Sequence, residues 1–239
     1  MKRVFVFDVD GTLTLPRGKI DSEFEEWFFD FIHKNDVYLV SGSDRAKTQE
    51  QISLRVYNAC LGVYQCNGNE HWKGSQRIKS TNWTPDFALE QFLRKKVSES
   101  RYPIKSGRHI EKRTGMINFS TIGRNATKEQ RADYYRWDQQ ARERELLAKY
   151  INKSYSNITA SVGGEISIDI YATGNDKSRV AKELAEHYDE IHFFGDRCDY
   201  GGNDFSIATM IKLTNTGVVN KVNSWQDTWE LLKRYGSKV

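Results

Sequence analysis

The sequence predicts an α/β fold, in which a doubly wound, Rossmann-like parallel sheet formed by residues 1–79 and 173–239 carries an inserted α+β domain at 80–172. Two observations predict this fold. Short apolar runs, each followed by acidic or small polar residues, alternate with helical patterns, which is typical of buried parallel strands in βαβ units. Between about 80 and 172 the pattern changes to hairpins and charged helices, which favours a separate layer.

The composition is that of a globular protein, with 38% hydrophobic and 28% charged residues in a chain of 239. No apolar run approaches the roughly 20 residues of a membrane span, and the first residues lead into a strand rather than a signal peptide. These features predict a cytoplasmic protein with no membrane partner.

The cysteines and the charge exclude several kinds of site. The 3 cysteines are odd in number and lack metal-ligand spacing, and the 5 histidines form no zinc pattern, so buried thiols are expected. The net charge of +4 comes from no single basic run. Small anionic substrates explain this charge as well as a nucleic acid does, and no nucleic-acid partner is expected.

The first predicted strand, at 4–7, is followed directly by two acidic residues, Asp8 and Asp10. Asp8 can act as a nucleophile, and Asp10 points to the same side of an extended chain. Two adjacent carboxylates repel each other, so the pair predicts Mg²⁺, which takes oxygen ligands. Gly11 and Thr12 can offer donors to an anion. The alternative is a surface Asp-x-Asp-Gly turn that closes a hairpin.

A second strand, at 37–40, follows a helix that begins after Asp21 and continues through His33. It ends in Ser41 and Ser43, at the start of a helix expected over about 45–57. Hydroxyls and N–H groups at a helix N-terminus favour phosphate, although a serine there can also be a plain N-cap.

The middle of the chain predicts hairpins and helices. Glycine turns and apolar alternation place hairpin strands within 62–78 and strands at about 108–111, 116–119, 158–162 and 166–170. Amphipathic spacing predicts a helix at 85–97 and one long, highly charged helix at 127–152.

The doubly wound pattern returns at Asp176, with a helix to about His187 and a strand at 191–194 that ends in Asp196. The loop that follows contains Asp204, a further group suited to a cation. A strand near 217–219 and a helix at 224–234 complete the sheet.

These segments together resemble the haloacid dehalogenase superfamily of phosphotransferases. The resemblance is carried by Asp-x-Asp-Gly-Thr at 8–12, Ser-Gly-Ser at 41–43, Lys177, Gly-Asp at 195–196 and Gly-Gly-Asn-Asp at 201–204. Within the superfamily, the segments 113–118, 122–131 and 163–169 are similar to the cap domain of eukaryotic-type phosphomannomutases. The inserted α+β domain is therefore expected to be that cap.

The resemblance implies roles for the core residues. Asp8 would be the nucleophile that becomes an aspartyl phosphate, and Asp10 the general acid and base. Mg²⁺ would be held by Asp8, the Asp10 carbonyl, Asp196 and Asp204, while Lys177 would neutralise the transferring group. Ser43, or Ser41, would donate to the phosphoryl oxygens.

The resemblance also implies a phosphosugar site on the cap. The residues that match it are Arg17, Arg113, Arg124, Arg131, Ser167 and Asp169. Arginine suits this task because its planar fork binds phosphate through two donors. Each arginine taken singly also fits a solvated surface position.

The implied activity interconverts mannose 6-phosphate and mannose 1-phosphate, with a hexose 1,6-bisphosphate as intermediate and activator, at the entry to GDP-mannose synthesis. A homodimer through the cap is implied by the family alone. Two alternatives stay open at this point: a Mg²⁺-dependent sugar-phosphate phosphatase on the same scaffold, and a noncatalytic binding module. Arginines for a second phosphate favour the mutase, and the intact acidic and lysine residues argue against mere binding.

Overall fold

The computed structural model describes residues 1–236 and divides them into two compact units. Unit 1 comprises Met1–Ser80, Asp176–Tyr200 and the described residues from Asp204 onward, and unit 2 comprises Thr81–Asn175 with Gly201–Asn203. The main segment of the second unit is therefore inserted in the chain between parts of the first, and a short loop at Gly201–Asn203 also belongs to it.

Unit 1 is built on a seven-stranded sheet in the order β11-β10-β1-β2-β3-β4-β5. Five strands are parallel: β1 (Arg3–Phe7), β2 (Val37–Val40), β3 (Gly62–Gln65), β10 (Glu190–Gly195) and β11 (Gly217–Lys221). The antiparallel strands β4 (Glu70–Lys73) and β5 (Gln76–Ser80) extend one edge. The predicted α/β class with a parallel sheet is confirmed.

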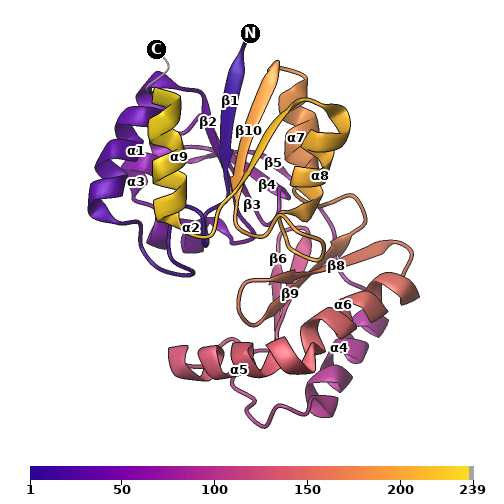
Figure 1. Ribbon diagram of the computed structural model, residues 1–239. Helices are drawn as coiled ribbons and strands as arrows, with labels where there is room; N and C mark the ends of the chain where they lie inside the picture. The colour runs from indigo at the N-terminus through magenta and orange to yellow at the C-terminus, as the bar shows by residue number, and fades with distance from the viewer. Residues whose placement is uncertain (237–239) are drawn as a thin grey trace. The chain divides into compact units, whose positions relative to one another are not determined.

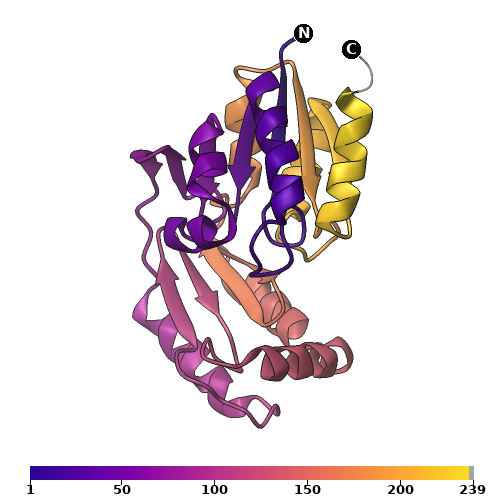
Figure 2. The same ribbon diagram turned by 90° about the vertical axis from the view of Figure 1, so that its left-hand side faces the viewer.

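Helices cover both faces of this sheet (Figure 1). One face carries α1 (Ser22–Lys34), α3 (Leu54–Ala59) and α9 (Trp225–Gly236), and the other carries α7 (Ser178–Ala185) and α8 (Phe205–Thr214). In Figure 2, the indigo α1 lies between α3 and the yellow α9 in one layer. The sheet therefore has an apolar core on each face. β1 contributes to both, because Phe5 and Phe7 pack into one core while Val4 and Val6 pack into the other.

The helix expected over 45–57 is wrong as a single element. The structure has α2 (Arg45–Gln51) and then α3, separated at Ile52 and Ser53. The Ser53 hydroxyl accepts a hydrogen bond from the Val56 amide and so caps a new helix. Ile52 is fully buried, which holds the chain at this break.

Unit 2 is a four-stranded antiparallel sheet with helices on one side (Figure 1). The strand order is β6 (Ile110–Arg113), β7 (Met116–Phe119), β9 (Ser167–Ala172) and β8 (Ile158–Gly163). The helices are α4 (Phe87–Glu99), α5 (Lys128–Ala141) and α6 (Glu143–Ser154). Residues of α4 and α6, including Leu93 and Ile151, form the core with the apolar face of the sheet.

The single helix expected at 127–152 is also wrong. Arg142 adopts a left-handed conformation, with φ 52°, and separates α5 from α6. A buried ion pair fixes this corner, because Arg144 Nε lies 2.7 Å from Asp138 Oδ2 and the Arg144 amide donates to Asp138 Oδ1. Residues 138–145 contain neither glycine nor proline, so the sequence carries no local signal for this break.

Two further expectations concern the whole chain. Cys60, Cys66 and Cys198 are buried thiols, as predicted. Within residues 1–236, the structure contains no helix with the length and apolar character that crossing a membrane requires.

Candidate active site

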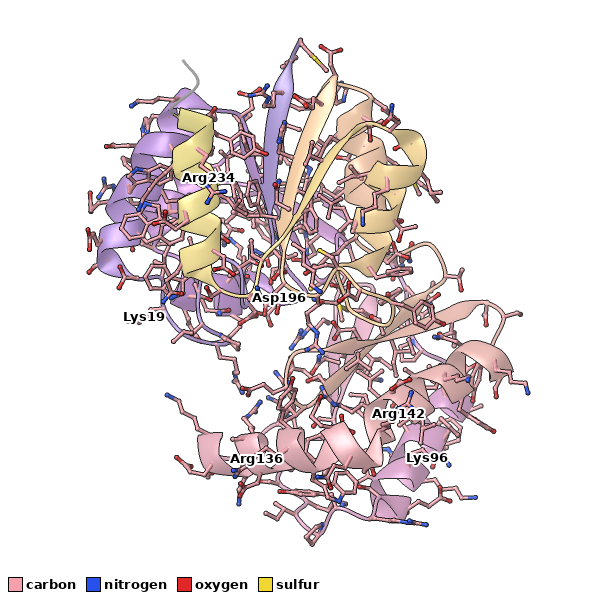
Figure 3. All side chains as sticks on the ribbon, in the orientation of Figure 1. Lys19, Lys96, Arg136, Arg142, Asp196 and Arg234 are labelled. Carbon is pink, nitrogen blue, oxygen red and sulfur yellow. The ribbon has the colours of Figure 1, made fainter. Side chains whose placement is uncertain are left out.

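Two aspartates meet at the carboxyl edge of the unit 1 sheet. The neighbouring strands β1 and β10 pair in parallel with Phe7 opposite Phe194, and the Asp8 amide continues the pairing by donating to the Phe194 carbonyl at 2.9 Å. Asp8 therefore follows β1 where Asp196 follows β10, and Figure 3 labels Asp196 at this edge. Ligands of open α/β sheets bind at such an edge.

Lys177 and Asp204 join these aspartates from the starts of two helices. Lys177 precedes α7, and its Nζ lies 2.6 Å from both Asp8 Oδ1 and Asp204 Oδ1. Lys177 and Asp204 have no exposed surface, and Asp8 is 2% exposed. Burying a lysine and two carboxylates costs free energy of folding unless each charge is compensated. Such clusters of buried charge are often found at functional sites, so this one is a candidate.

The electrostatics of the cluster favour a cation. Burial, and then the charge of Asp204, raise the pKa of Asp8 well above its usual value, while Lys177 acts in the opposite direction. Burial and Asp204 also raise the pKa of Asp196, to about 7. Burial disfavours the charge on Lys177, but Asp204 and Asp8 outweigh it and raise the pKa of the ammonium. The carboxylates thus crowd more negative charge than Lys177 alone neutralises.

The donor set fits Mg²⁺. One carboxylate oxygen from each of Asp8, Asp196 and Asp204 lies within 4.8 Å of the others, and hard divalent cations take such oxygen ligands. Gly11 keeps this space open, because a Cβ on it would lie 2.5 Å from Asp196 Oδ2, and its φ of +82° also suits glycine.

The Asp10 carboxylate lies outside this acidic cluster and has its own partners. Its Oδ1 accepts from the Arg17 amide at 2.6 Å and from Gln51 Nε2 at 2.8 Å. Gln51 is the last residue of α2, is 2% exposed, and also donates to Thr14 Oγ1 at 3.3 Å. Sequence reasoning missed Gln51, since nothing in the sequence distinguishes it from an ordinary helical glutamine.

The serines of the second strand end lie in a buried turn. Ser41 and Ser43 are 1% and 9% exposed, and the Ser43 amide donates to Ser41 Oγ at 3.0 Å. Thr12 is fully buried, and its hydroxyl has no hydrogen-bond partner among the described residues. An unsatisfied buried hydroxyl at this position would be satisfied by a bound anion.

Three of the predicted sugar-site residues gather on the sheet of unit 2. Arg113 at the end of β6 and Arg124 in the loop after β7 both bind the carboxylate of Glu111. Arg124 Nη1 also donates to Ser167 Oγ at 3.0 Å, at the start of β9. Sequence reasoning missed Glu111, although its position two residues before Arg113 places both on one face of the strand.

Of the other two residues of this group in unit 2, Arg131 contacts the same network and Asp169 has a partner of its own. Arg131, buried on α5, donates from Nη2 to the carbonyl of Arg124 at 2.7 Å. Asp169 on β9 accepts from Asn118 Nδ2 at 2.7 Å, across the β7–β9 pair. Arg17 belongs to unit 1, where it is exposed and has a φ of 60°.

Solved structures with a similar fold are named as a phosphatase and a nucleotidase. The chain matches the C-terminal domain of a Candida albicans trehalose-6-phosphate phosphatase with a TM-score of 0.60 at 18% identity, covering 94% of this chain and 81% of that one. It matches an IMP-bound mutant of Plasmodium falciparum IMP-nucleotidase with a TM-score of 0.64 at 14% identity, covering 99% and 68%. These matches show that the chain shares the α/β fold of those proteins.

Proteins related in sequence identify the family of the chain, which the structural matches do not. A phosphomannomutase from Drosophila melanogaster is 35% identical over 216 residues, which is 85% of each chain. One from Dendrobium officinale is 35% identical over 238 residues, covering 96% of this chain and 92% of the relative. The family model of eukaryotic phosphomannomutase matches residues 24–235. The chain described here therefore belongs to the eukaryotic phosphomannomutase family.

Proposed function

We propose that this phosphomannomutase interconverts mannose 6-phosphate and mannose 1-phosphate through an aspartyl phosphate and a hexose 1,6-bisphosphate. The observation that carries the mechanism is the buried Asp8–Lys177–Asp204 cluster beside Asp196. A positioned carboxylate, an ammonium and a cation site are the parts that phosphoryl transfer needs.

Asp8 acts as the nucleophile in this proposal. In the working cycle, the phosphoryl group on Asp8 passes to a hydroxyl of the hexose monophosphate, so that the Asp8–phosphorus bond breaks and a sugar–phosphate bond forms. The bisphosphate then reorients and returns its other phosphoryl group to Asp8. Lys177, 2.6 Å from Asp8, compensates negative charge on the nucleophile and on the transferring group. The Thr12 hydroxyl gives an anion a buried donor.

Asp10 handles the proton. It accepts the proton of the attacking sugar hydroxyl and gives it to the departing sugar oxygen on return. The hydrogen bonds from Gln51 and from the Arg17 amide hold one oxygen of this carboxylate in place. The second oxygen is the one that we assign to the substrate.

Asp8, Asp196 and Asp204 would hold Mg²⁺, with the Asp10 carbonyl as a further ligand, and the ion would neutralise charge on the phosphoryl group. Burial and the charge of Asp204 raise the pKa of Asp8 and of Asp196, so a cation would compensate negative charge that these surroundings disfavour.

The arginine network of unit 2 would bind the phosphate that is not being transferred. Arg113, Arg124 and Arg131, with Ser167, form one connected set of donors in unit 2, and Asp169 suits a sugar hydroxyl. A site for a second phosphate is useful to a mutase and has little use in simple hydrolysis. We assign Arg17 of unit 1 to the substrate on the family match.

Three other properties stay predictions: a bisphosphate activator, cytoplasmic location and a homodimer through the cap. Phe87, 77% exposed at the start of α4, gives unit 2 an apolar contact group for the last of these. Sedimentation of wild type against Phe87→Ser tests that role.

A phosphorus NMR time course tests the activity. Purified protein receives Mg²⁺, mannose 1-phosphate and a catalytic amount of hexose 1,6-bisphosphate. The mutase gives mannose 6-phosphate without matching free phosphate. Free phosphate as the main product would make the protein a phosphatase, and no product at all would contradict the proposed substrate.

A further inference from the structure

Glu111 lies between two arginines of the proposed phosphosugar site. Its Oε1 accepts from Arg113 Nη2 at 2.6 Å and from Arg113 Nε at 2.7 Å, and its Oε2 accepts from Arg124 Nε at 3.0 Å. The side chains of Arg113, Arg124 and Glu111 are only 8%, 17% and 20% exposed. One carboxylate therefore joins two arginines that come from different parts of the chain.

The carboxylate of Glu111 offsets the repulsion between the positive charges of Arg113 and Arg124. Guanidinium groups that share a partly buried site repel each other, and the repulsion grows as water is removed. Burial raises the pKa of Glu111, but the charges of Arg113 and Arg124 outweigh it and lower that pKa. Glu111 is therefore a charged counter-ion at neutral pH.

The geometry of the link fixes orientation as well as charge. Glu111 binds both guanidinium groups through Nε, which leaves the terminal nitrogen Nη1 of Arg124 directed to Ser167 Oγ at 3.0 Å. Arginine has several rotatable bonds, and ordering such a side chain on binding costs conformational entropy. A group that orders both arginines beforehand reduces that cost.

We propose that Glu111 is a positioning residue that holds Arg113 and Arg124 ready for the phosphate of the sugar. The inference rests on the proposed binding of that phosphate by these arginines. Glu111 itself carries the same charge as phosphate and does not bind it.

A positioning role and a merely electrostatic role predict opposite effects. The Glu111→Gln variant removes a negative charge beside the site, so arginines that stayed in place would bind an anion more tightly. If Glu111 positions them, the same variant loses charge-assisted hydrogen bonds to both arginines and binds the anion less tightly.

The experiment compares Glu111→Gln with Glu90→Gln as the matched control. Glu90, on α4 of the same unit, pairs with Lys112, the neighbour of Glu111 in β6. Initial rates against mannose 1-phosphate are measured with saturating bisphosphate and Mg²⁺, and affinity by calorimetry. We expect Glu111→Gln to raise KM and the dissociation constant about tenfold, with kcat within about twofold of wild type. The control should leave all three unchanged.

The outcomes separate this inference from the proposed function. An unchanged or lowered KM in Glu111→Gln overturns the positioning role, while a raised KM in Arg113→Ala and Arg124→Ala would still support the phosphate site. If neither arginine variant raises KM, the site itself is wrong and the inference falls with it. Should Glu111→Gln fail to fold, Glu111→Asp replaces it, because the shorter side chain cannot reach both arginines; an unchanged KM there also overturns the proposal.

Discussion

Replacing Lys177 by methionine removes the only cation shown to bridge Asp8 and Asp204 in the described structure. All three side chains are at most 3% exposed, so water cannot replace the lost charge. Removing one partner of a buried ion pair typically costs about 3–5 kcal/mol of the free energy of unfolding. For a domain of this size, that loss lowers the melting temperature by roughly 6–20 °C.

The loss should also depend on pH. Without Lys177, the pKa of Asp8, already raised by burial, rises further. A carboxyl group whose pKa is higher in the folded than in the unfolded state contributes stability at low pH, and that contribution disappears as the pH rises through the folded-state pKa. The deficit of Lys177→Met relative to wild type should therefore be larger at pH 8 than at pH 5.

Urea unfolding with EDTA present, followed by tryptophan fluorescence, measures this deficit. Lys182→Met is the matched control, since Lys182 lies on the same helix, is exposed, and should change stability by less than about 0.5 kcal/mol. Adding Asp204→Asn to Lys177→Met should restore part of the loss. A deficit below about 1 kcal/mol, or one that is equal at pH 5 and pH 8, would refute the reasoning from buried charge.

Three further predictions concern the same edge of the sheet. Asp8→Asn should abolish turnover while leaving the fold intact, as circular dichroism checks; retained activity with the same Mg²⁺ dependence would remove Asp8 as the nucleophile. The affinity for Mg²⁺ should be about tenfold weaker at pH 6 than at pH 8, because Asp196, with a pKa of about 7, must lose its proton to bind the ion; a flat calorimetric profile over this range would contradict that pKa. Gln51→Leu should lower kcat at least about tenfold, because Asp10 loses a donor that orients it, and leave Mg²⁺ affinity unchanged; wild-type kcat would show that the Arg17 amide alone suffices.

Much of the unit 1 fold could be predicted because the parallel strands carry strong local signals. The apolar runs that became β1, β2 and β10 each end in polar residues, and parallel pairing brings those ends to one edge. The breaks at Ser53 and Arg142 could not be predicted in the same way. The corner at Arg142 depends on the buried pair of Asp138 and Arg144, whose contact exists only in the folded chain.

The residues of the site also divide into those that local sequence signals predicted and those that depend on contacts in the folded chain. Asp8 and Asp196 follow strands, so both the sequence pattern and the resemblance predicted them as site residues. Lys177 was predicted by the resemblance alone. Gln51 and Glu111 contact proposed site residues through side chains alone. Their importance comes from tertiary neighbours, and for Gln51 no local pattern encodes the neighbour 41 positions away.

The place of β1 in the sheet has a consequence for how the chain is made. β1 pairs with β2 early, but its other neighbour, β10, lies more than 180 positions later, with Arg3 opposite Glu190. A ribosome therefore makes Thr81–Asn175, the main part of unit 2, before it supplies the strand that covers β1 on that side. Until then β1 has an open, apolar pairing edge, so the nascent chain is exposed to wrong strand pairing, and contacts of such long separation also fold slowly. The architecture that gathers the acidic cluster at one edge thus leaves β1 unpaired on one side until β10 has been made.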